Sequence, residues 1–256
     1  NLKKFPMFNL KKVTKARKRL NFLTSILFKL FQINLRYTEK RNEYGVEIFE
    51  YFYLPWRTDI NFNNSYKMIN NHTLNPKSRL FTIYELSKLY LVDNSSFIEV
   101  GTWKGGVCGL VSFSNPSKNI DIFACDSFTG VKNSGKNDTF FKNEEYSDAT
   151  AEDLIELSKV TPHEIKIIEG VFPDSIKSTI LTKKISMAHI DVDTYISAKQ
   201  SFEYISELLI PGGVIILDDY GGWFTDGVTK FGNELKNNTD YFSIPNHLGQ
   251  MVIFKK

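Results

Sequence analysis

The sequence predicts an α/β fold with a doubly wound, mostly parallel sheet, preceded by a helical or irregular N-terminal extension. From residue 95 onward, short apolar runs alternate with helical patterns, which is typical of a parallel sheet with helices on both faces. The run 97–100 leads into a glycine-rich turn and a helix that opens at Val107, an arrangement that holds small ligands. The 256 residues, 42% of them hydrophobic, suffice for one substantial core. We therefore expect an extension and arm over residues 1–75 and one α/β domain over residues 76–256.

The expected elements follow from apolar patterning and from the residues that interrupt it. Pro76 precedes a helix whose apolar stripe recurs at helical spacing between Leu80 and Tyr90. The last two apolar runs are close enough in sequence to pair antiparallel. In chain order, the predicted strands are 96–100, 120–125, 165–169, 185–190, 214–217, 241–244 and 251–254, and the predicted helices include 151–159 and one that Asp174 or Ser175 caps.

The first 38 residues are strongly basic. They contain ten lysines and arginines and no acid, so the remainder holds 22 basic and 29 acidic residues, although the whole chain has a net charge of +3. The apolar run from Leu20 to Leu35 is too short and too interrupted, by Lys29 and Gln32, to span a bilayer, because a span needs about 20 apolar residues. An amphipathic helix is predicted by the apolar residues that recur there at helical spacing, which are Leu20, Leu23, Leu27, Leu30 and Phe31. Such a basic helix can lie on an anionic membrane surface as a peripheral contact, or pack on the body or on a second subunit of a homo-oligomer.

The two cysteines, Cys108 and Cys125, lie in an apolar helix and an apolar strand. This placement favours packing roles over disulfides or a zinc site, so we expect a reducing, cytoplasmic compartment. No basic stripe with interleaved aromatic residues crosses the body of the chain, so a nucleic-acid partner is not expected.

The glycine-rich turn after residue 100 excludes two phosphate-binding loops. A dinucleotide-binding loop needs a second glycine where this chain has Trp103, and a Walker A loop needs Lys-Ser or Lys-Thr after its last glycine. What remains is an acidic-x-Gly-x-x-x-Gly pattern formed by Glu99, Gly101 and Gly105, which is typical of class I S-adenosylmethionine (SAM) methyltransferases. Since the ligand of those enzymes carries ammonium and sulfonium charges, nearby carboxylates favour it. The alternative is a plain strand, turn and helix.

Asp126 ends the second predicted strand, 27 residues after Glu99. A carboxylate at this place can accept hydrogen bonds from both hydroxyls of a ribose, and the alternative role is to cap a turn. The polar stretch 129–150 that follows is either a lid over the ligand or a surface insertion.

Four aspartates follow the ends of the fourth and fifth predicted strands. Because the ends of parallel strands meet at one edge of the sheet, their negative charges are expected to converge there. Uncompensated carboxylates raise each other's pKa, and a hard divalent cation with oxygen ligands removes this conflict. We therefore predict a Mg²⁺ site with Asp191, Asp218 and Asp219 as ligands and Asp193 as the general base. His189 is either a structural histidine or a support for these ligands.

Several motifs in order and spacing resemble the TylF/macrocin O-methyltransferase family. The resemblance covers roughly residues 52–256 and is carried by Glu99-Val-Gly-Thr-Trp-Lys-Gly-Gly106, Asp126-Ser-Phe-Thr-Gly130, Gly170-Val-Phe-Pro-Asp174, His189-Ile-Asp-Val-Asp-Thr-Tyr195 and Pro211-Gly-Gly with Asp218-Asp-Tyr-Gly221.

The resemblance implies a SAM-dependent, Mg²⁺-dependent O-methyltransferase that acts on a sugar hydroxyl of a glycan, a nucleotide sugar or a glycosylated natural product. It implies that Asp191 and Asp193 serve as metal ligand and base and that Asp218 and Asp219 complete the metal site. The motif positions predicted to contact the cofactor are Glu99, Gly101, Thr102, Trp103, Gly105, Asp126, Ser127, Gly130, Gly170, Phe172 and Asp191.

Two features depart from the family pattern. The basic leader over residues 1–38 is not part of it, and the stretch 228–232 replaces a helix of small residues. Both concern the acceptor and the subunit arrangement. The alternative functions are a metal-dependent hydrolase, for which the chain lacks a phosphate loop and a histidine-rich metal set, and a non-catalytic partner subunit of the same fold.

Overall fold

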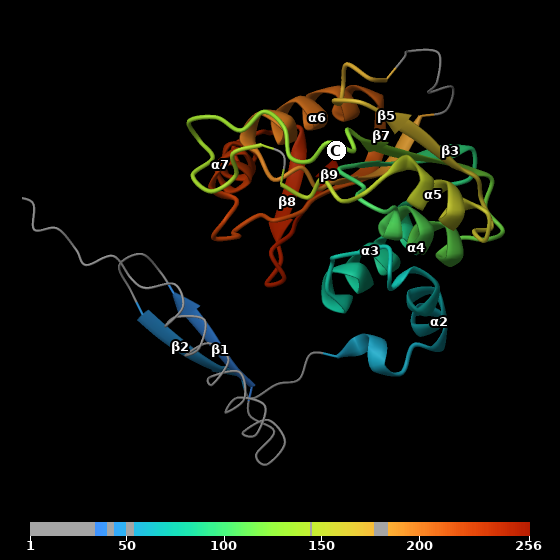
Figure 1. The fold of residues 1–256 in the computed structure, drawn as a ribbon, viewed down its shortest axis with the longest axis horizontal. Helices are drawn as coiled ribbons and strands as arrows, with labels where there is room; N and C mark the ends of the chain where they lie inside the picture. Colours follow the sequence, from blue (N-terminus) through green and yellow to red (C-terminus); the bar gives the residue numbers. More distant parts are fainter. Residues whose placement is uncertain (1–33, 40–43, 50–53, 144, 177–183) are drawn as a thin grey trace, which may run out of the picture. The chain divides into compact units, whose positions relative to one another are not determined.

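The computed structural model divides the chain into two compact units, Asn1–Leu54 and Pro55–Lys256. The structure describes residues 34–39, 44–49, 54–143, 145–176 and 184–256 (Figure 1).

The described part of the first unit is a β-hairpin. Strands β1 (Asn34–Glu39) and β2 (Tyr44–Phe49) pair antiparallel, with Asn34 opposite Phe49. The sequence shows only weak strand or helix signals here. The amphipathic helix predicted upstream falls on residues outside the described ones, so the expected membrane or subunit contact of residues 1–38 stays a prediction, as does the domain boundary at residue 75.

The second unit is built on a seven-stranded sheet in the order β5-β4-β3-β6-β7-β9-β8. Strands β3 to β7 run parallel to one another, whereas β9 is antiparallel to both β7 and β8. This confirms the predicted doubly wound sheet and the antiparallel pairing of the last two strands. The chain moves outward from β3 to β5 and then returns beside β3 to form β6, and such a switch point opens a crevice for a ligand. The strands are β3 (Ser95–Val100), β4 (Ile120–Asp126), β5 (Ile165–Glu169), β6 (Ile185–Ile190), β7 (Leu209–Leu217), β8 (Tyr241–Pro245) and β9 (Met251–Lys255).

Helices cover both faces of this sheet, as Figure 1 shows. Successive strand residues point to opposite faces, so Phe97 packs in one hydrophobic cluster and Ile98 in the other. The first cluster contains side chains of α2 (Ile60–Ile69), α3 (Lys77–Tyr90), α4 (Gly106–Ser114) and α5 (Ala151–Ser158), and the second contains those of α6 (Tyr195–Leu208) and α7 (Asp226–Leu235); the short helix η1 (Pro55–Arg57) precedes them.

Local sequence explains most of the element boundaries. Helix α3 begins directly after Pro76, and α5 begins at a capping box between Thr150 and Asp153. Strands β5 and β6 match the predicted bounds. Strand β7 begins five residues earlier than predicted, because Leu209 pairs with Ile185 before a register shift. The helix expected after Asp174 falls on residues 177–183, which lie outside the described ones.

Two further predictions concern the core and the membrane. Cys108 and Cys125 are buried free thiols whose pKa values are raised well above the ordinary value, first by burial, so they pack in the core as expected. Among the residues that the structure describes, no helix is long and apolar enough to cross a membrane.

Candidate active site

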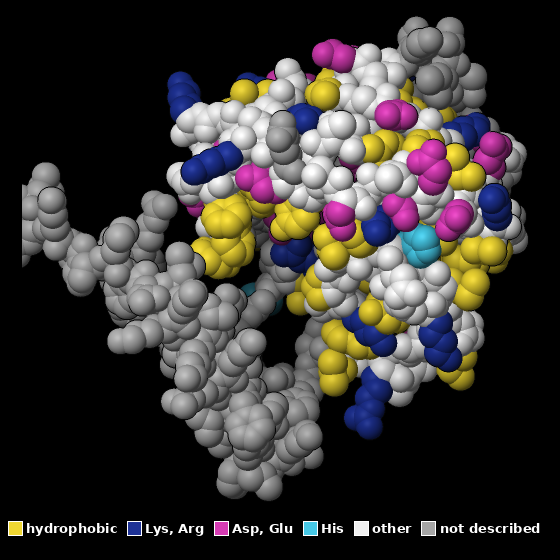
Figure 2. All heavy atoms as spheres, viewed as in Figure 1, with side chains coloured by type: hydrophobic (Ala, Val, Ile, Leu, Met, Phe, Trp, Pro, Cys, Tyr) yellow, Lys and Arg dark blue, Asp and Glu magenta, His cyan; other side chains and the backbone are white. Residues whose placement is uncertain are grey.

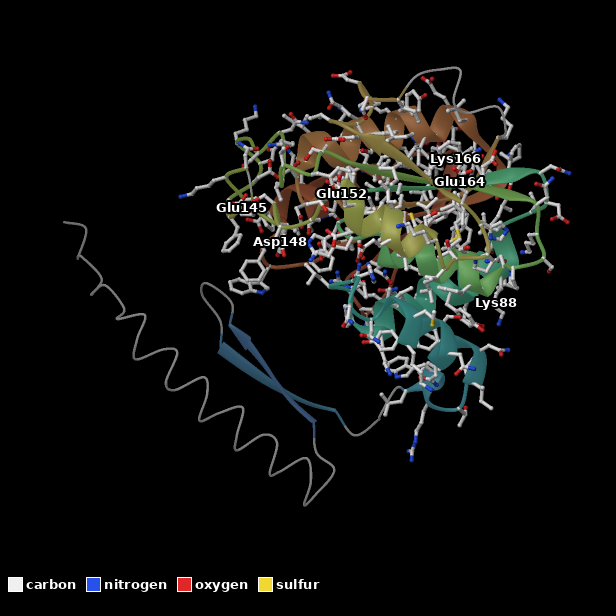
Figure 3. All side chains as sticks on the ribbon, turned by 45° about the vertical axis from the view of Figure 1, so that its right-hand side comes forward. Lys88, Glu145, Asp148, Glu152, Glu164 and Lys166 are labelled. Carbon is white, nitrogen blue, oxygen red and sulfur yellow. The ribbon has the colours of Figure 1, made fainter. Side chains whose placement is uncertain are left out.

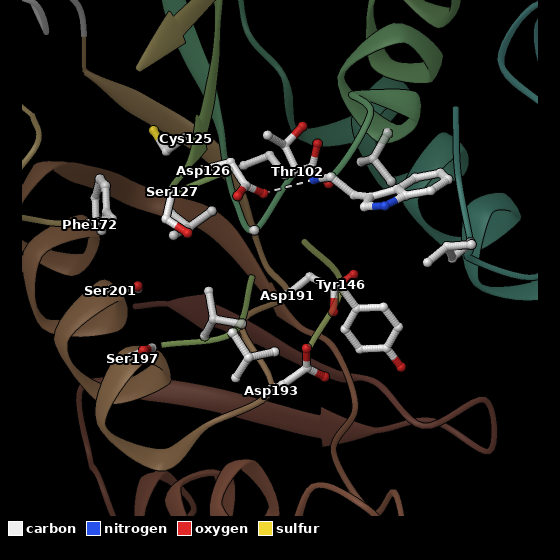
Figure 4. Close-up of a pocket in the computed structure, with 18 of the residues that line it drawn as sticks. Thr102, Cys125, Asp126, Ser127, Tyr146, Phe172, Asp191, Asp193, Ser197 and Ser201 are labelled. Carbon is white, nitrogen blue, oxygen red and sulfur yellow. Dashed lines mark hydrogen bonds between the residues drawn. The ribbon is translucent and has the colours of Figure 1, made fainter. Parts of the chain in front are cut away.

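A cavity of about 280 Å³ opens where β3, β4, β5 and β6 end (Figure 4). Its lining includes the turn after β3, the end of β4, the loop 127–150, the turn after β5 and the segment after β6. The cavity brings together ten of the predicted cofactor residues: Glu99, Gly101, Thr102, Trp103, Asp126, Ser127, Gly130, Gly170, Phe172 and Asp191. Gly105 does not line it. At a φ of +81°, Gly105 instead starts helix α4, and a Cβ there would lie 2.8 Å from the Leu154 side chain.

The turn after β3 is a tight contact between two strand ends. Gly101 has a φ of +80°, and a Cβ at this position would lie 1.8 Å from the backbone oxygen of Asp191. The backbone N–H of Asp191 in turn donates to the carbonyl of Val100 at 2.8 Å. Only glycine combines this backbone conformation with so close an approach. The glycine therefore sets the distance between the predicted cofactor loop and the predicted acid site.

Asp126 lies at the end of β4 and holds the same turn. One of its carboxylate oxygens accepts from the backbone N–H of Trp103 at 2.9 Å, and the other accepts from that of Phe128 at 2.9 Å. Asp126 therefore caps these two turns, which is the role that the alternative interpretation gives it. Each carboxylate oxygen has a second lone pair, and Asp126 faces the cavity (Figure 4), so the predicted ribose contact is sterically compatible with these bonds.

The polar loop 127–150 forms one wall of the cavity through residues that include Gly130 and Tyr146. The indole N–H of Trp103 donates to Asp148 at 2.9 Å, and the backbone N–H of Tyr195 donates to Asp138 at 2.9 Å. Figure 3 shows Glu145 and Asp148 on this loop and Glu152 on the neighbouring helix α5. The loop is therefore attached to the turn after β3 and to the start of α6 and lines the cavity, while its role as a lid stays a prediction.

A fully buried histidine joins the two halves of the site. Nδ1 of His189 lies 3.0 Å from Glu99 and Nε2 lies 3.1 Å from Asp218, while Cys108 donates to Glu99 at 3.1 Å. Burial disfavours a charged imidazole, but the hydrogen bonds to Asp218 and Glu99 outweigh burial and raise the pKa of His189 well above its ordinary value. Both ring nitrogens then carry protons and donate. The two interpretations of His189 converge, since it is a core residue that also orients two acids.

The acids after β6 and β7 meet as the topology predicts. Oxygens of Asp191, Asp193 and Asp219 lie within 4.8 Å of one another, and a second set with this spacing joins Asp191 and Asp218 to His189. Burial, followed by the charges of Asp218 and Asp219, raises the pKa of Asp191 well above its ordinary value. Burial and then Asp219 do the same for Asp193. Asp193 and Asp219 also have φ values of 63° and 59°, a conformation that non-glycine residues adopt rarely and often at functional sites.

Two cavity residues outside the predicted cofactor, metal and catalytic sets contact these acids. Nη1 of Arg79 lies 3.0 Å from Asp218 and 2.7 Å from Asp219, and its Nε donates to the carbonyl of Leu248 at 2.8 Å. The side-chain amide of Asn75 donates to Asp191 at 3.1 Å. No local pattern marks either residue, because each reaches its partner across more than 100 residues of chain.

The donor set fits a hard divalent cation. Five carboxylates and two positive side chains, His189 and Arg79, meet in this part of the molecule, so an excess of negative charge remains. The carboxylates are those of Glu99, Asp191, Asp193, Asp218 and Asp219. Carboxylate oxygens at this spacing are the ligands that Mg²⁺ prefers. Asp191 and Asp219 line the cavity, whereas Asp218 is 1% exposed and turns toward His189. The predicted ligand set stays a prediction, and Asp193 is a further oxygen donor within reach.

Comparison with known proteins bears directly on this site. The model of the macrocin-O-methyltransferase (TylF) family matches residues 69–252. The chain belongs to this family. The resemblance noted in the sequence is thereby confirmed, and the chain is an O-methyltransferase. No curated protein matches the chain at a significant level.

Solved structures share the fold of this macrocin-O-methyltransferase family member. The O-methyltransferase NovP has a TM-score of 0.59 and 17% identity, over 72% of this chain and 82% of that one. Apo CalS11, described as a TDP-rhamnose 3'-O-methyltransferase of calicheamicin biosynthesis, has a TM-score of 0.51 and 16% identity, over 80% and 96%. An O-methyltransferase from Bacillus cereus in complex with SAH has a TM-score of 0.51 and 12% identity, over 92% and 97%. The fold is that of class I SAM methyltransferases.

Proposed function

We propose that this chain transfers the methyl group of SAM to a sugar hydroxyl with the assistance of Mg²⁺. The observation that carries the proposal is that one cavity contains both the glycine turn after β3 and the oxygens of Asp191, Asp193 and Asp219 within 4.8 Å of one another. The family match supports the reaction, and the sugar acceptor of the structurally similar CalS11 supports the substrate class.

The cofactor would lie along the turn after β3. Asp126 stands at the end of β4, where it can accept hydrogen bonds from ribose hydroxyls, and Gly170 and Phe172 form the wall beyond it. The negative charge of the acid cluster favours a ligand with a sulfonium centre and an ammonium group. Because Gly101 contacts the backbone of Asp191, a methyl donor in this turn lies next to the acids.

The acids would bind the metal and accept a proton. A Mg²⁺ ion held by Asp191, Asp218 and Asp219 would lower the pKa of an acceptor hydroxyl and orient its oxygen toward the methyl group. Asp193 is the residue that we assign as the base. The protein environment raises its pKa, and a more basic carboxylate takes a proton more readily. His189 fixes the orientation of Asp218 through a hydrogen bond of 3.1 Å.

Calorimetry and a transfer assay test the proposal together. S-adenosylhomocysteine (SAH) is titrated into the protein with Mg²⁺ and with EDTA, and transfer from labelled SAM to methyl glycosides is measured under both conditions. We expect SAH to bind under both conditions and transfer to require Mg²⁺. Equal transfer in EDTA would refute the metal role, and failure of SAH to bind would refute the cofactor. SAH binding without transfer to any sugar would refute the sugar acceptor.

A further inference from the structure

A row of five aromatic rings leads from the cavity onto the surface. We call Tyr146, Phe141, Phe140, Phe224 and Trp223 the aromatic strip. Successive ring centroids are 6.1, 5.3, 4.4 and 3.5 Å apart in this order. The first three rings belong to the loop 127–150, whereas the last two belong to the connection between β7 and α7. Rings from two separate loops thus form one row of contacts, in which Phe141 is buried, at 4% exposed, and Phe224 is partly buried.

Much of the aromatic strip is open to solvent. Tyr146 is 54% exposed, Phe140 50% and Trp223 68%. In Figure 2, exposed hydrophobic side chains gather beside the region of α7. Soluble proteins rarely expose several large aromatic rings side by side, and such patches mark binding surfaces. The exposed faces of these rings are therefore available to a ligand.

One end of the aromatic strip lies at the acid cluster. Tyr146 lines the cavity, and Figure 4 shows it next to Asp191 and Asp193. At the other end, Trp223 follows Asp219 by four positions, with three residues between them, which is a chain length of at most about 14 Å. An acceptor whose hydroxyl reaches Asp193 would continue along these rings.

Hydrogen bonds attach the loop 127–150 to helix α7. Thr139 donates to Asp226 at 2.5 Å, and Lys230 donates to Asn137 at 3.0 Å. Both bonds join the loop 127–150 to helix α7. The aromatic strip is consequently formed before a ligand arrives, which lowers the entropy lost on binding.

We propose that the aromatic strip is a second sugar-binding subsite, so that the acceptor is an oligosaccharide or the end of a sugar chain rather than a single sugar. This inference rests on the proposed function and extends it. A sugar ring has an apolar face of C–H bonds, which packs on the electron-rich face of an aromatic ring, and a rim of hydroxyls, which needs polar partners. The aromatic strip supplies the aromatic faces, and Asp226, Lys230 and Asn137 beside it supply polar partners for the hydroxyls.

The same features argue against an apolar aglycone as the occupant. An apolar ligand is bound best in an enclosed groove that removes most of its surface from water. The aromatic strip is instead open, and polar side chains border it. The cavity of about 280 Å³ is small for a ligand site and must already hold the cofactor, so the rest of the acceptor lies outside it.

The test compares acceptors of increasing length. Methyl glycosides of rhamnose, glucose, galactose and mannose and the corresponding disaccharides and trisaccharides are offered with labelled SAM to the wild type and to Trp223→Ala and Phe140→Ala. In the wild type we expect kcat/KM to rise about tenfold from the monosaccharide to the longer acceptors, mainly through KM. Each variant should lose most of this rise and keep the wild-type rate on the monosaccharide.

Phe242→Ala is the matched control, since Phe242 is 57% exposed on β8 and lies outside the aromatic strip. The control should behave as the wild type. An equal loss on acceptors of all lengths, or no loss on any, would overturn the subsite while SAH binding still supported the proposed function. A greater gain from an octyl glycoside than from the disaccharide would assign the aromatic strip to an apolar aglycone. A change of oligomeric state in Trp223→Ala on size-exclusion chromatography would assign it to a second copy of the chain. Absence of transfer to every sugar, with SAH bound, would refute both the sugar acceptor and the subsite.

Discussion

Replacing Gly101 by alanine should disrupt both the turn after β3 and the cavity. A Cβ at this position would lie 1.8 Å from the backbone oxygen of Asp191, so the two segments must separate by about 1.6 Å to restore an ordinary contact of 3.4 Å. Overpacking of this kind destabilises proteins by about 1–3 kcal/mol, and the left-handed backbone adds about 1–2 kcal/mol for a residue with a Cβ. We therefore expect Gly101→Ala to lower the free energy of unfolding by about 2–5 kcal/mol.

Gly212→Ala isolates the steric part of this effect. Gly212 has a similar φ of +74°, but nothing lies within 4 Å of a Cβ placed there, so only the backbone strain of about 1–2 kcal/mol applies. Urea denaturation gives the free energy of unfolding of both variants, and calorimetry gives their affinity for SAH. Gly101→Ala should be the less stable by about 1–3 kcal/mol and should bind SAH at least about tenfold more weakly, whereas Gly212→Ala should bind it normally.

Equal destabilisation of the two variants would show that the close approach of Gly101 to Asp191 does not exist. Normal SAH affinity in a destabilised Gly101→Ala would show that the turn does not hold the cofactor.

Three further variants test the acids and the histidine of the site. Asp126→Ala should weaken SAH binding by about tenfold in calorimetry without changing Mg²⁺ affinity, because it loses the ribose acceptor; an unchanged SAH affinity would contradict this. Asp193→Asn should abolish transfer. In EDTA at pH 7.5 it should nevertheless raise the free energy of unfolding by roughly 1 kcal/mol, because folding raises the pKa of the Asp193 carboxyl, and a carboxyl with a raised pKa destabilises the fold at every pH above the pKa of the unfolded state. His189→Asn should lower the free energy of unfolding by about 3–5 kcal/mol, since it removes the contacts of 3.0 and 3.1 Å that the imidazole makes with the buried Glu99 and Asp218. Because folding raises the pKa of His189, the stability that its charged imidazole contributes is fully present below pH 6.5 and is lost as the pH rises through the higher pKa of the folded state. The difference in free energy of unfolding between His189→Asn and the wild type should therefore shrink at high pH. A difference that stays constant with pH would contradict the charged imidazole.

Strand positions were predictable from sequence wherever burial on both faces of the sheet demands a continuous apolar run. Strand β6, which is buried throughout, matches the expected bounds for this reason, and the edge strand β5 matches them although it is only partly buried. The start of β7 runs through Pro211 and two glycines, where side chains are exposed and no such run exists. The residues of the β1–β2 hairpin carry only weak strand signals in the sequence.

The convergence of the acids was predictable because parallel topology alone places Asp191 and Asp219 at one edge. The partners of these acids were not predictable. Arg79 reaches Asp219 across 140 residues, and His189 reaches Glu99 across 90, so the contacts depend on how α3 and the strands pack together. Helix α7 forms over Asp226–Leu235 even though this stretch departs from the family pattern, because its buried residues Val228, Phe231 and Leu235 recur at helical spacing.

The position of β9 has a consequence for biosynthesis. This strand lies between β7 and β8 although it follows both in the chain, so the two earlier strands have no shared neighbour until residues 251–255 have left the ribosome. During translation the backbone N–H and C=O groups on the edge of β7 that faces away from β6 have no strand partner until β9 is made. A nascent chain halted at residue 245 would hold an open strand edge, and such edges invite pairing with other chains. Emergence of residues 251–255 from the ribosome is therefore the step that joins β8 to the rest of the sheet.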